Sequence, residues 1–168
     1  MLKTGFTLGL FAFATQVFAQ QGTESNPYVL EPTPSTVAWG HYWSEYPPAL
    51  KIKSGDFVKV HTLITSNPER LEAAGVAADQ VEKQLRDVQS MKDKGPGGHI
   101  LTGPIYVEGA DSGDILEVRL QSIDLAIPYG YNAIGSAGFL SDEIFARNMR
   151  IVPLDAKKNI AQIGRAHV

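Results

Sequence analysis

Residues that favour turns divide this chain into short segments. The 168 residues include 16 glycines and 10 prolines, and several segments between them alternate apolar and polar residues, which is the period of a half-buried strand. Residues 57–64 and 116–121 both alternate in this way. The residues expected to face inward are Val58, Val60, Thr62 and Ile64 in the first segment and Leu116, Val118 and Leu120 in the second. Short strands between turns predict a mainly β fold, a β-sandwich or a related all-β domain.

One segment has the period of a helix instead. Asn67-Pro68 combines an N-cap residue with a proline at the first helical position. The next 25 or so residues are rich in Glu, Ala, Gln, Lys and Leu, with Gly75 as an interruption. We therefore expect a helical insertion over about residues 68–92, in two pieces at about 68–74 and 77–92. A broken apolar stripe would face the core, formed by Leu71, Val76, Val81, Leu85 and Val88.

Charge and composition exclude several classes of function. Lys and Arg total 15 against 18 Asp and Glu, a net charge of −3, and a mildly acidic chain without a basic stripe is a poor candidate for nucleic-acid binding. The absence of cysteine excludes disulfide frameworks, thiolate zinc sites and thiol catalysis. The serine-nucleophile patterns Gly-x-Ser-x-Gly and Ser-x-x-Lys are absent. The glycines at 95–98 lack the Lys-Ser/Thr that completes a phosphate-binding loop.

The two ends of the chain differ from the body. Residues 1–19 have the features of a secretory signal, with Lys3, an apolar run at 6–13 and a small-x-small cleavage site at Val17-Phe18-Ala19. We expect a secreted or periplasmic protein without membrane attachment after cleavage; a buried N-terminal helix is the alternative. One possible reverse translation of residues 162–168 resembles a common sequencing-adapter read. We therefore interpret these residues as a non-native tail, with a genuine polar tail as the alternative. The body of the domain is then residues 20–161.

A histidine after a run of glycines is the first candidate for chemistry. Gly95-Pro96-Gly97-Gly98 supplies positive φ angles and close backbone approach, and His99 follows it. Glu108 lies nine positions later, at the far end of the next short strand. A histidine and a carboxylate from adjacent segments can share a metal ion or act as a base and its orienting partner. Alternatively, His99 caps a turn and Glu108 binds a loop backbone.

Aromatic residues suggest where a small ligand could bind. Tyr129 and Tyr131 lie in what we interpret as an aromatic loop and could line a pocket, with ordinary core or loop packing as the alternative. His41 lies in a second aromatic loop, where it belongs to a pocket rim or to surface packing. His61, on the polar face of a predicted strand, is interpreted as a satisfied surface residue rather than a ligand.

The stretch around His99 resembles a known family. Residues 95–114 read Gly-Pro-Gly-Gly-His-Ile-Leu-Thr-Gly-Pro-Ile-Tyr-Val-Glu-Gly-Ala-Asp-Ser-Gly-Asp, which is similar to the N-terminal half of the acetamidase/formamidase family. The resemblance extends over about residues 30–155. It implies a β-sandwich protein that hydrolyses short amides such as formamide or acetamide with a divalent metal, zinc or calcium. By position, it makes His99 and Glu108 the local candidates for metal binding and catalysis, and a carboxylate would move the proton of the attacking water.

The chain also departs from that family. A second half with Gly-Gly-Asn-x-Asp and Asp-x-His…Gly-Asp-Gly-Glu segments is absent. We therefore expect an incomplete metal site, no amidase activity for this chain alone, and an exposed apolar surface where the missing half would pack. The alternative function is an exported β-sandwich module that binds a small polar ligand through the aromatic loops 39–46 and 128–132. Homo-oligomer formation is left open by the sequence.

Overall fold

The computed structural model describes residues 21–134 and 148–164. The predicted signal sequence, most of the predicted tail and the small residues at 135–138 lie outside the described residues. In chain order the elements are β1 (Tyr28–Leu30), β2 (Val37–Trp39), β3 (Leu50–Lys53), β4 (Val58–Val60), α1 (Pro68–Ala73), the 3₁₀ helix η1 (Ala78–Gln80), α2 (Lys83–Gln89), β5 (Ile100–Thr102), β6 (Ile105–Glu108), β7 (Tyr129–Ile134), β8 (Asn148–Asp155) and β9 (Ile160–Ala161).

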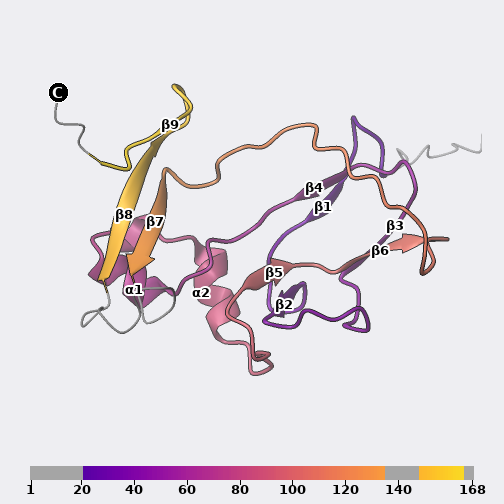
Figure 1. The fold of residues 1–168 in the computed structure, drawn as a ribbon, viewed down its shortest axis with the longest axis horizontal. Helices are drawn as coiled ribbons and strands as arrows, with labels where there is room; N and C mark the ends of the chain where they lie inside the picture. Colours follow the sequence, from indigo (N-terminus) through magenta and orange to yellow (C-terminus); the bar gives the residue numbers. More distant parts are fainter. Residues whose placement is uncertain (1–20, 135–147, 165–168) are drawn as a thin grey trace, which may run out of the picture.

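The fold is mainly β with a short helical insertion, as the sequence predicts (Figure 1). Strand pairs β1–β4 and β3–β6 are parallel, whereas β2–β5 and the β7–β8–β9 sheet are antiparallel. A cis peptide bond joins Gly103 to Pro104 between β5 and β6. Among the described residues, the helices are too short to cross a bilayer.

The helical insertion forms where the sequence predicts it. The Asn67 side chain accepts a hydrogen bond of 2.8 Å from the backbone N–H of Arg70, so it caps α1 as expected. The predicted second piece is too long at both ends, because η1 occupies residues 78–80 and α2 spans only Lys83–Gln89. Val81 and Glu82 between them have extended backbone, which separates the two turns of helix.

The core lies between these helices and the strands β2, β5 and β7. All five residues of the predicted stripe are buried, and Leu71, Leu85 and Val88 have no exposed surface. They belong to one cluster that also contains Val37, Leu63, Ile100 and Tyr129. Burial of a leucine side chain contributes about 2–3 kcal/mol, so the insertion is an integral part of the domain.

The predicted inward face of residues 57–64 is wrong at Val60 and Thr62, whereas Ile64 packs against the core as expected. Strand β4 ends at Val60, which is 39% exposed, and Thr62 is also exposed. Leu63, of the opposite parity, is buried in the core cluster. The reason is that β4 pairs only with β1, and the chain then leaves this sheet toward the helices.

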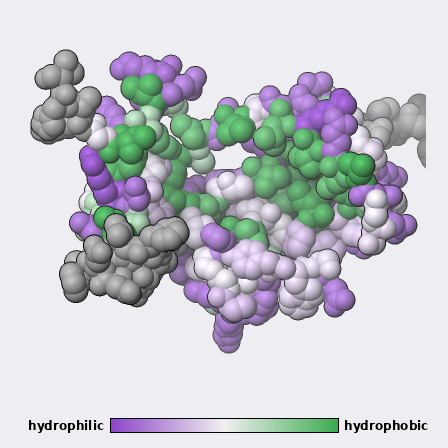
Figure 2. All heavy atoms as spheres, in the orientation of Figure 1, coloured by the Kyte–Doolittle hydropathy of each residue, from purple (hydrophilic) through white to green (hydrophobic). Residues whose placement is uncertain are grey.

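The second predicted strand does not form. Residues 115–125 cross the molecule between β6 and β7 without forming a helix or a strand (Figure 1). The predicted inward residues are exposed instead, with Leu116 at 63%, Val118 at 72% and Leu120 at 76%. Figure 2 shows hydrophobic residues along this crossing. No strand within the described residues pairs with the segment, so its alternation has no partner surface to bury. An apolar surface is therefore exposed, as expected; that a second half packs on it stays a prediction.

His61 links three parts of the fold. Its Nδ1 lies 2.9 Å from a carboxylate oxygen of Glu31 and its Nε2 lies 2.8 Å from one of Glu82. Its carbonyl accepts a hydrogen bond of 2.8 Å from the Thr102 hydroxyl. Desolvation of the imidazole lowers its pKa, but the hydrogen bonds and charges of Glu82 and Glu31 outweigh this effect and raise the pKa above 6.5. The interpretation of His61 as a residue with satisfied polar groups is confirmed.

The His61 link predicts how stability depends on pH. A histidine whose pKa is raised in the folded state contributes stability below pH 6.5 and loses that contribution as the pH rises through the folded-state pKa. We expect the His61 contribution to the free energy of unfolding to be smaller at pH 8.5 than at pH 6. Urea titrations of the wild-type chain and of His61→Gln measure it, and the difference between the two should shrink at the higher pH. A difference that grows with pH would contradict this assignment.

Candidate functional site

The glycine loop, residues 95–99, is held against the end of β2 by backbone hydrogen bonds. Gly95 N–H donates to the Trp39 carbonyl at 2.8 Å and Gly97 N–H to the Gly40 carbonyl at 3.2 Å. In return, Gly40 N–H donates to the His99 carbonyl at 2.9 Å. Three backbone bonds over five residues therefore place His99 and Trp39 side by side at one end of the β2–β5 pair.

Glycine is required in this loop because the backbones approach closely. A Cβ added at Gly95 would lie 2.5 Å from the Gly40 carbonyl oxygen, and one added at Gly97 would collide with the Tyr42 ring. The predicted close approach is thus confirmed. The predicted positive φ angles are wrong for the loop itself, since the left-handed residue is Gly40 in the facing segment, with φ of +69°.

His99 is exposed but its ring is held in place. Its Nδ1 lies 2.6 Å from the Tyr42 hydroxyl, and the two rings meet edge to face with centroids 5.9 Å apart. The same hydroxyl accepts a hydrogen bond from His99 N–H at 3.3 Å. Within the described residues Nε2 makes no hydrogen bond, so this nitrogen is available to solvent or a ligand.

Glu108 lies away from His99. It ends β6, where it is exposed and pairs in register with Lys53 of β3. Strands β5 and β6 follow one another along the chain (Figure 1), so the two candidates lie at opposite ends of this run. In the part of the chain that the structure describes, no three His, Asp or Glu side chains converge as metal ligands would.

A cavity of about 270 Å³ opens beside the glycine loop. We call it the Ser66 pocket; its lining residues are Trp39, Thr65, Ser66, Asn67, Arg70, Gln89, Gly98 and Tyr131. The Ser66 hydroxyl oxygen is buried and has no hydrogen-bond partner among residues 21–134 and 148–164. An unpartnered buried hydroxyl costs about 1–3 kcal/mol, and Ser66 lines the pocket together with Arg70. Within the described residues Arg70 forms no ion pair, so a small polar ligand could use both groups.

The two candidate tyrosines have different surroundings. The predicted loop at residues 128–132 is wrong, because Tyr129–Ile134 forms strand β7 and pairs with β8. Tyr129 is 5% exposed in the core, and its hydroxyl donates to the Gln80 carbonyl at 3.3 Å. Burial and the charge of Glu82 raise the pKa of Tyr129, so the phenol stays protonated. Tyr131 lines the Ser66 pocket, where its hydroxyl donates to the Thr65 carbonyl.

The first aromatic loop is a loop, as predicted. Residues 40–49 form no strand or helix, and the His41 ring stacks on Tyr46 with centroids 5.0 Å apart. Its Nε2 lies 3.0 Å from the Asp93 carboxylate. His41 therefore takes part in surface packing, and the Ser66 pocket is lined without it.

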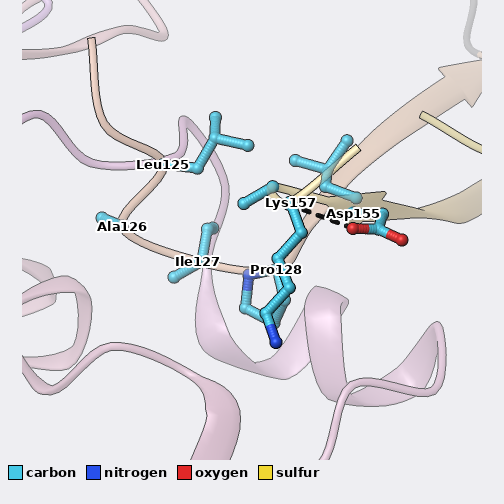
Figure 3. A pocket seen from close by; sticks show the side chains of 8 residues that line it. Leu125, Ala126, Ile127, Pro128, Asp155 and Lys157 are labelled. Carbon is cyan, nitrogen blue, oxygen red and sulfur yellow. Dashed lines mark hydrogen bonds between the residues drawn. The ribbon is translucent and has the colours of Figure 1, made fainter. Parts of the chain in front are cut away.

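A larger hollow of about 500 Å³ lies elsewhere, between residues 125–128 and the end of β8 (Figure 3). Its walls are mostly aliphatic, with Asp155 and Lys157 as the charged residues. Asp155 accepts a hydrogen bond of 3.1 Å from the Lys157 backbone N–H. None of the predicted site residues lines it, so its composition suits apolar contact rather than a reaction.

Ser66 and Arg70 were not expected from the sequence. Ser66 lies just before the N-cap Asn67, where a serine is common in turns. Arg70 has the sequence context of an ordinary residue on a helix surface. Only the fold shows that β2, the glycine loop and β7 close around them.

A comparison with protein-family models gives a match over most of the chain. The model of the acetamidase/formamidase family matches residues 34–161. The match includes the glycine loop, His99, Glu108 and every residue that lines the Ser66 pocket. A search of curated proteins found no significant match.

The geometry of the glycine loop predicts the effect of adding one methyl group. Gly97→Ala would push the Tyr42 ring away and break its hydrogen bond with His99; overpacking of this kind costs about 1–3 kcal/mol. Gly98→Ala is the matched control, because nothing lies within 4 Å of its added Cβ. The ¹⁵N shifts of the His99 imidazole and the urea midpoint measure both effects. Equal responses of the two variants would contradict the packing of Tyr42 on the loop.

Proposed function

Because the chain belongs to the acetamidase/formamidase family, we propose that it takes part in the hydrolysis of short linear amides such as formamide or acetamide. Water would add to the amide carbonyl, and the C–N bond would break to give a carboxylate and ammonia. The observation that carries the proposal is the family match over the whole glycine loop and its histidine.

We propose His99 as the acid–base group. The Tyr42 hydroxyl fixes its ring through Nδ1 and leaves Nε2 free among the described residues. If the phenol donates to Nδ1, then Nε2 carries the proton and can donate it; if Nδ1 donates to the phenol oxygen, then Nε2 can accept a proton from water. Glu108 lies at the other end of the β5–β6 run, so we propose no joint step of Glu108 with His99.

A divalent metal is the part of the proposal that these residues fit least well. Zinc sites use three or four protein ligands, and calcium takes six or more oxygens. The described residues offer no such group, and Nδ1 of His99 is engaged by Tyr42. Zinc or calcium would need ligands from outside the described residues. We therefore derive no step through a metal and propose that this chain alone does not turn over amides.

A second function is favoured by the Ser66 pocket. A small polar ligand would give the unpartnered Ser66 hydroxyl a hydrogen bond and place a carbonyl or carboxylate near Arg70. This is the role of a binding module without catalysis. The 39–46 loop remains available to such a module, since Tyr42 and Trp43 are more than half exposed, whereas β7 supplies only Tyr131.

An assay of ammonia release tests the first proposal. We expect the purified chain to release no ammonia from formamide or acetamide above the uncatalysed rate, with or without added Zn²⁺ or Ca²⁺, because no three ligand side chains converge within the described residues. His99→Ala is measured alongside. Metal-dependent turnover that His99→Ala abolishes would contradict the proposed inactivity and would establish the amidase activity in this chain.

Substitution of Ser66 tests the second proposal through stability and binding together. Ser66→Ala removes an unsatisfied buried hydroxyl, so the free energy of unfolding should stay the same or rise by about 1 kcal/mol. The same variant should weaken acetamide or acetate binding, measured by amide chemical-shift titration. Ser54→Ala, in an exposed turn, should change neither quantity. A loss of stability in Ser66→Ala would show that the hydroxyl has a structural role instead.

A further inference from the structure

Residues 115–125, which we call the apolar crossing, have an unpaired backbone and exposed apolar side chains inside the described chain. Its backbone N–H and C=O groups make no hydrogen bonds there. Ile115 is 97% exposed and Ile123 is 78% exposed. An exposed, apolar length of chain with an unpaired backbone is a template for strand addition.

The apolar crossing forms no strand in this chain, but one side-chain contact indicates an extended backbone. Arg119 Nε donates a hydrogen bond of 2.7 Å to the Glu117 carboxylate. Residues two apart share a side only when the backbone is extended, and the residues between them then point to the other side. The charged pair therefore lies on one face, and Leu116, Val118 and Leu120 lie on the other.

The sequence of this segment is complementary to itself. Around Val118 it reads Leu116-Glu117-Val118-Arg119-Leu120, with leucine at equal distances on both sides and opposite charges between. When two such strands run antiparallel about Val118, each Leu116 faces Leu120 of the second copy. Each Glu117 then faces Arg119 of the second copy.

We propose that a second copy of this chain is the partner of the apolar crossing, and that residues 116–120 of the two copies pair as antiparallel strands about a two-fold axis at Val118. The interface is isologous, with the same patch on both copies. Two opposite-charge pairs and three apolar pairs form, and each is of a kind that stabilises neighbouring strands.

Other registers are disfavoured by charge. A centre at residue 117 places Glu117 opposite Glu117, and a centre at 119 places Arg119 opposite Arg119; a parallel in-register pair does both. Like charges directly opposite destabilise a strand pair. A shift of one residue turns the apolar side chains to the other face. A two-stranded ribbon is marginally stable by itself, so we expect a weak, concentration-dependent dimer.

Charge reversal tests the pairing. Glu117→Arg and Arg119→Glu each place like charges opposite one another twice, so each should raise the dimer dissociation constant about tenfold or more at low ionic strength. Both residues are about 70% exposed, so neither variant should lose its fold. The double variant E117R/R119E restores opposite charges and should dimerise. An equimolar mixture of the two single variants should form heterodimers, measured by sedimentation velocity.

A single cysteine tests the register. The chain contains no cysteine, and Val118 is the one position of the segment that faces itself, so Val118→Cys should form a disulfide-linked dimer on mild oxidation. Gln121→Cys is the control on the same segment. In the proposed register the two Gln121 positions lie six residues apart along the ribbon, about 20 Å, so they should not cross-link.

Two results would overturn the proposal. One is a chain that stays monomeric at every concentration, as it would if the apolar crossing pairs with a different polypeptide segment. The other is a dimer that both charge reversals leave unchanged, which would place the interface elsewhere. Equal cross-linking at positions 118 and 121 would contradict the register.

Discussion

The close approach of the glycine loop to the end of β2 is the constraint on which the rest of the site depends. Gly95 and Gly97 lie so near the Gly40 backbone and the Tyr42 ring that no side chain fits between them. This contact fixes the start of β5, and with it the pairing of β5 with β2 and the position of Ile100 in the core. The same contact brings His99 to Tyr42 and forms one wall of the Ser66 pocket. The glycine loop thus positions the site and also supplies Gly98 to its wall.

How much of the fold could be predicted depended on the range of the interactions that decide it. The helical insertion was predictable because a cap at Asn67 and a stripe of apolar residues act within one turn or two. The prediction of a strand at residues 116–121 fails, because alternation indicates only that one face is apolar. Whether a strand forms depends on a neighbour that supplies hydrogen bonds, and the described chain does not contain one. The sequence places Tyr129 in a loop for a related reason: its strand forms by pairing with Pro153, which lies 24 residues further along the chain.

In the candidate site, too, short-range features could be predicted from the sequence and long-range ones could not. His99 was found from the sequence because the glycine run before it is a local signal, and the family match covers it. Its partner Tyr42 lies 57 residues away in sequence, and no local pattern links the two. Ser66 carried no signal, because a serine before an N-cap is common in turns. The expected partnership of His99 with Glu108 rested on their closeness in sequence, but an extended chain separates residues nine apart by nearly its full length.

Buried polar groups without hydrogen bonds and exposed apolar side chains are informative because both raise the free energy of the folded state. Within the part of the chain that the structure describes, the Ser66 hydroxyl is buried without a hydrogen bond, and the backbone of the apolar crossing is unpaired beside exposed aliphatic side chains. A small ligand is enough to supply the one hydrogen bond that the Ser66 hydroxyl lacks. The apolar crossing needs a whole strand to pair its backbone, so its partner would be a polypeptide. Both differ from Tyr129, whose hydroxyl and ring are fully engaged within the core. Tyr129 therefore stabilises the fold itself. At Ser66 and the apolar crossing, by contrast, binding of a partner would lower the free energy of the folded chain further. On that basis the Ser66 pocket and the apolar crossing are the two places where this chain should bind something else.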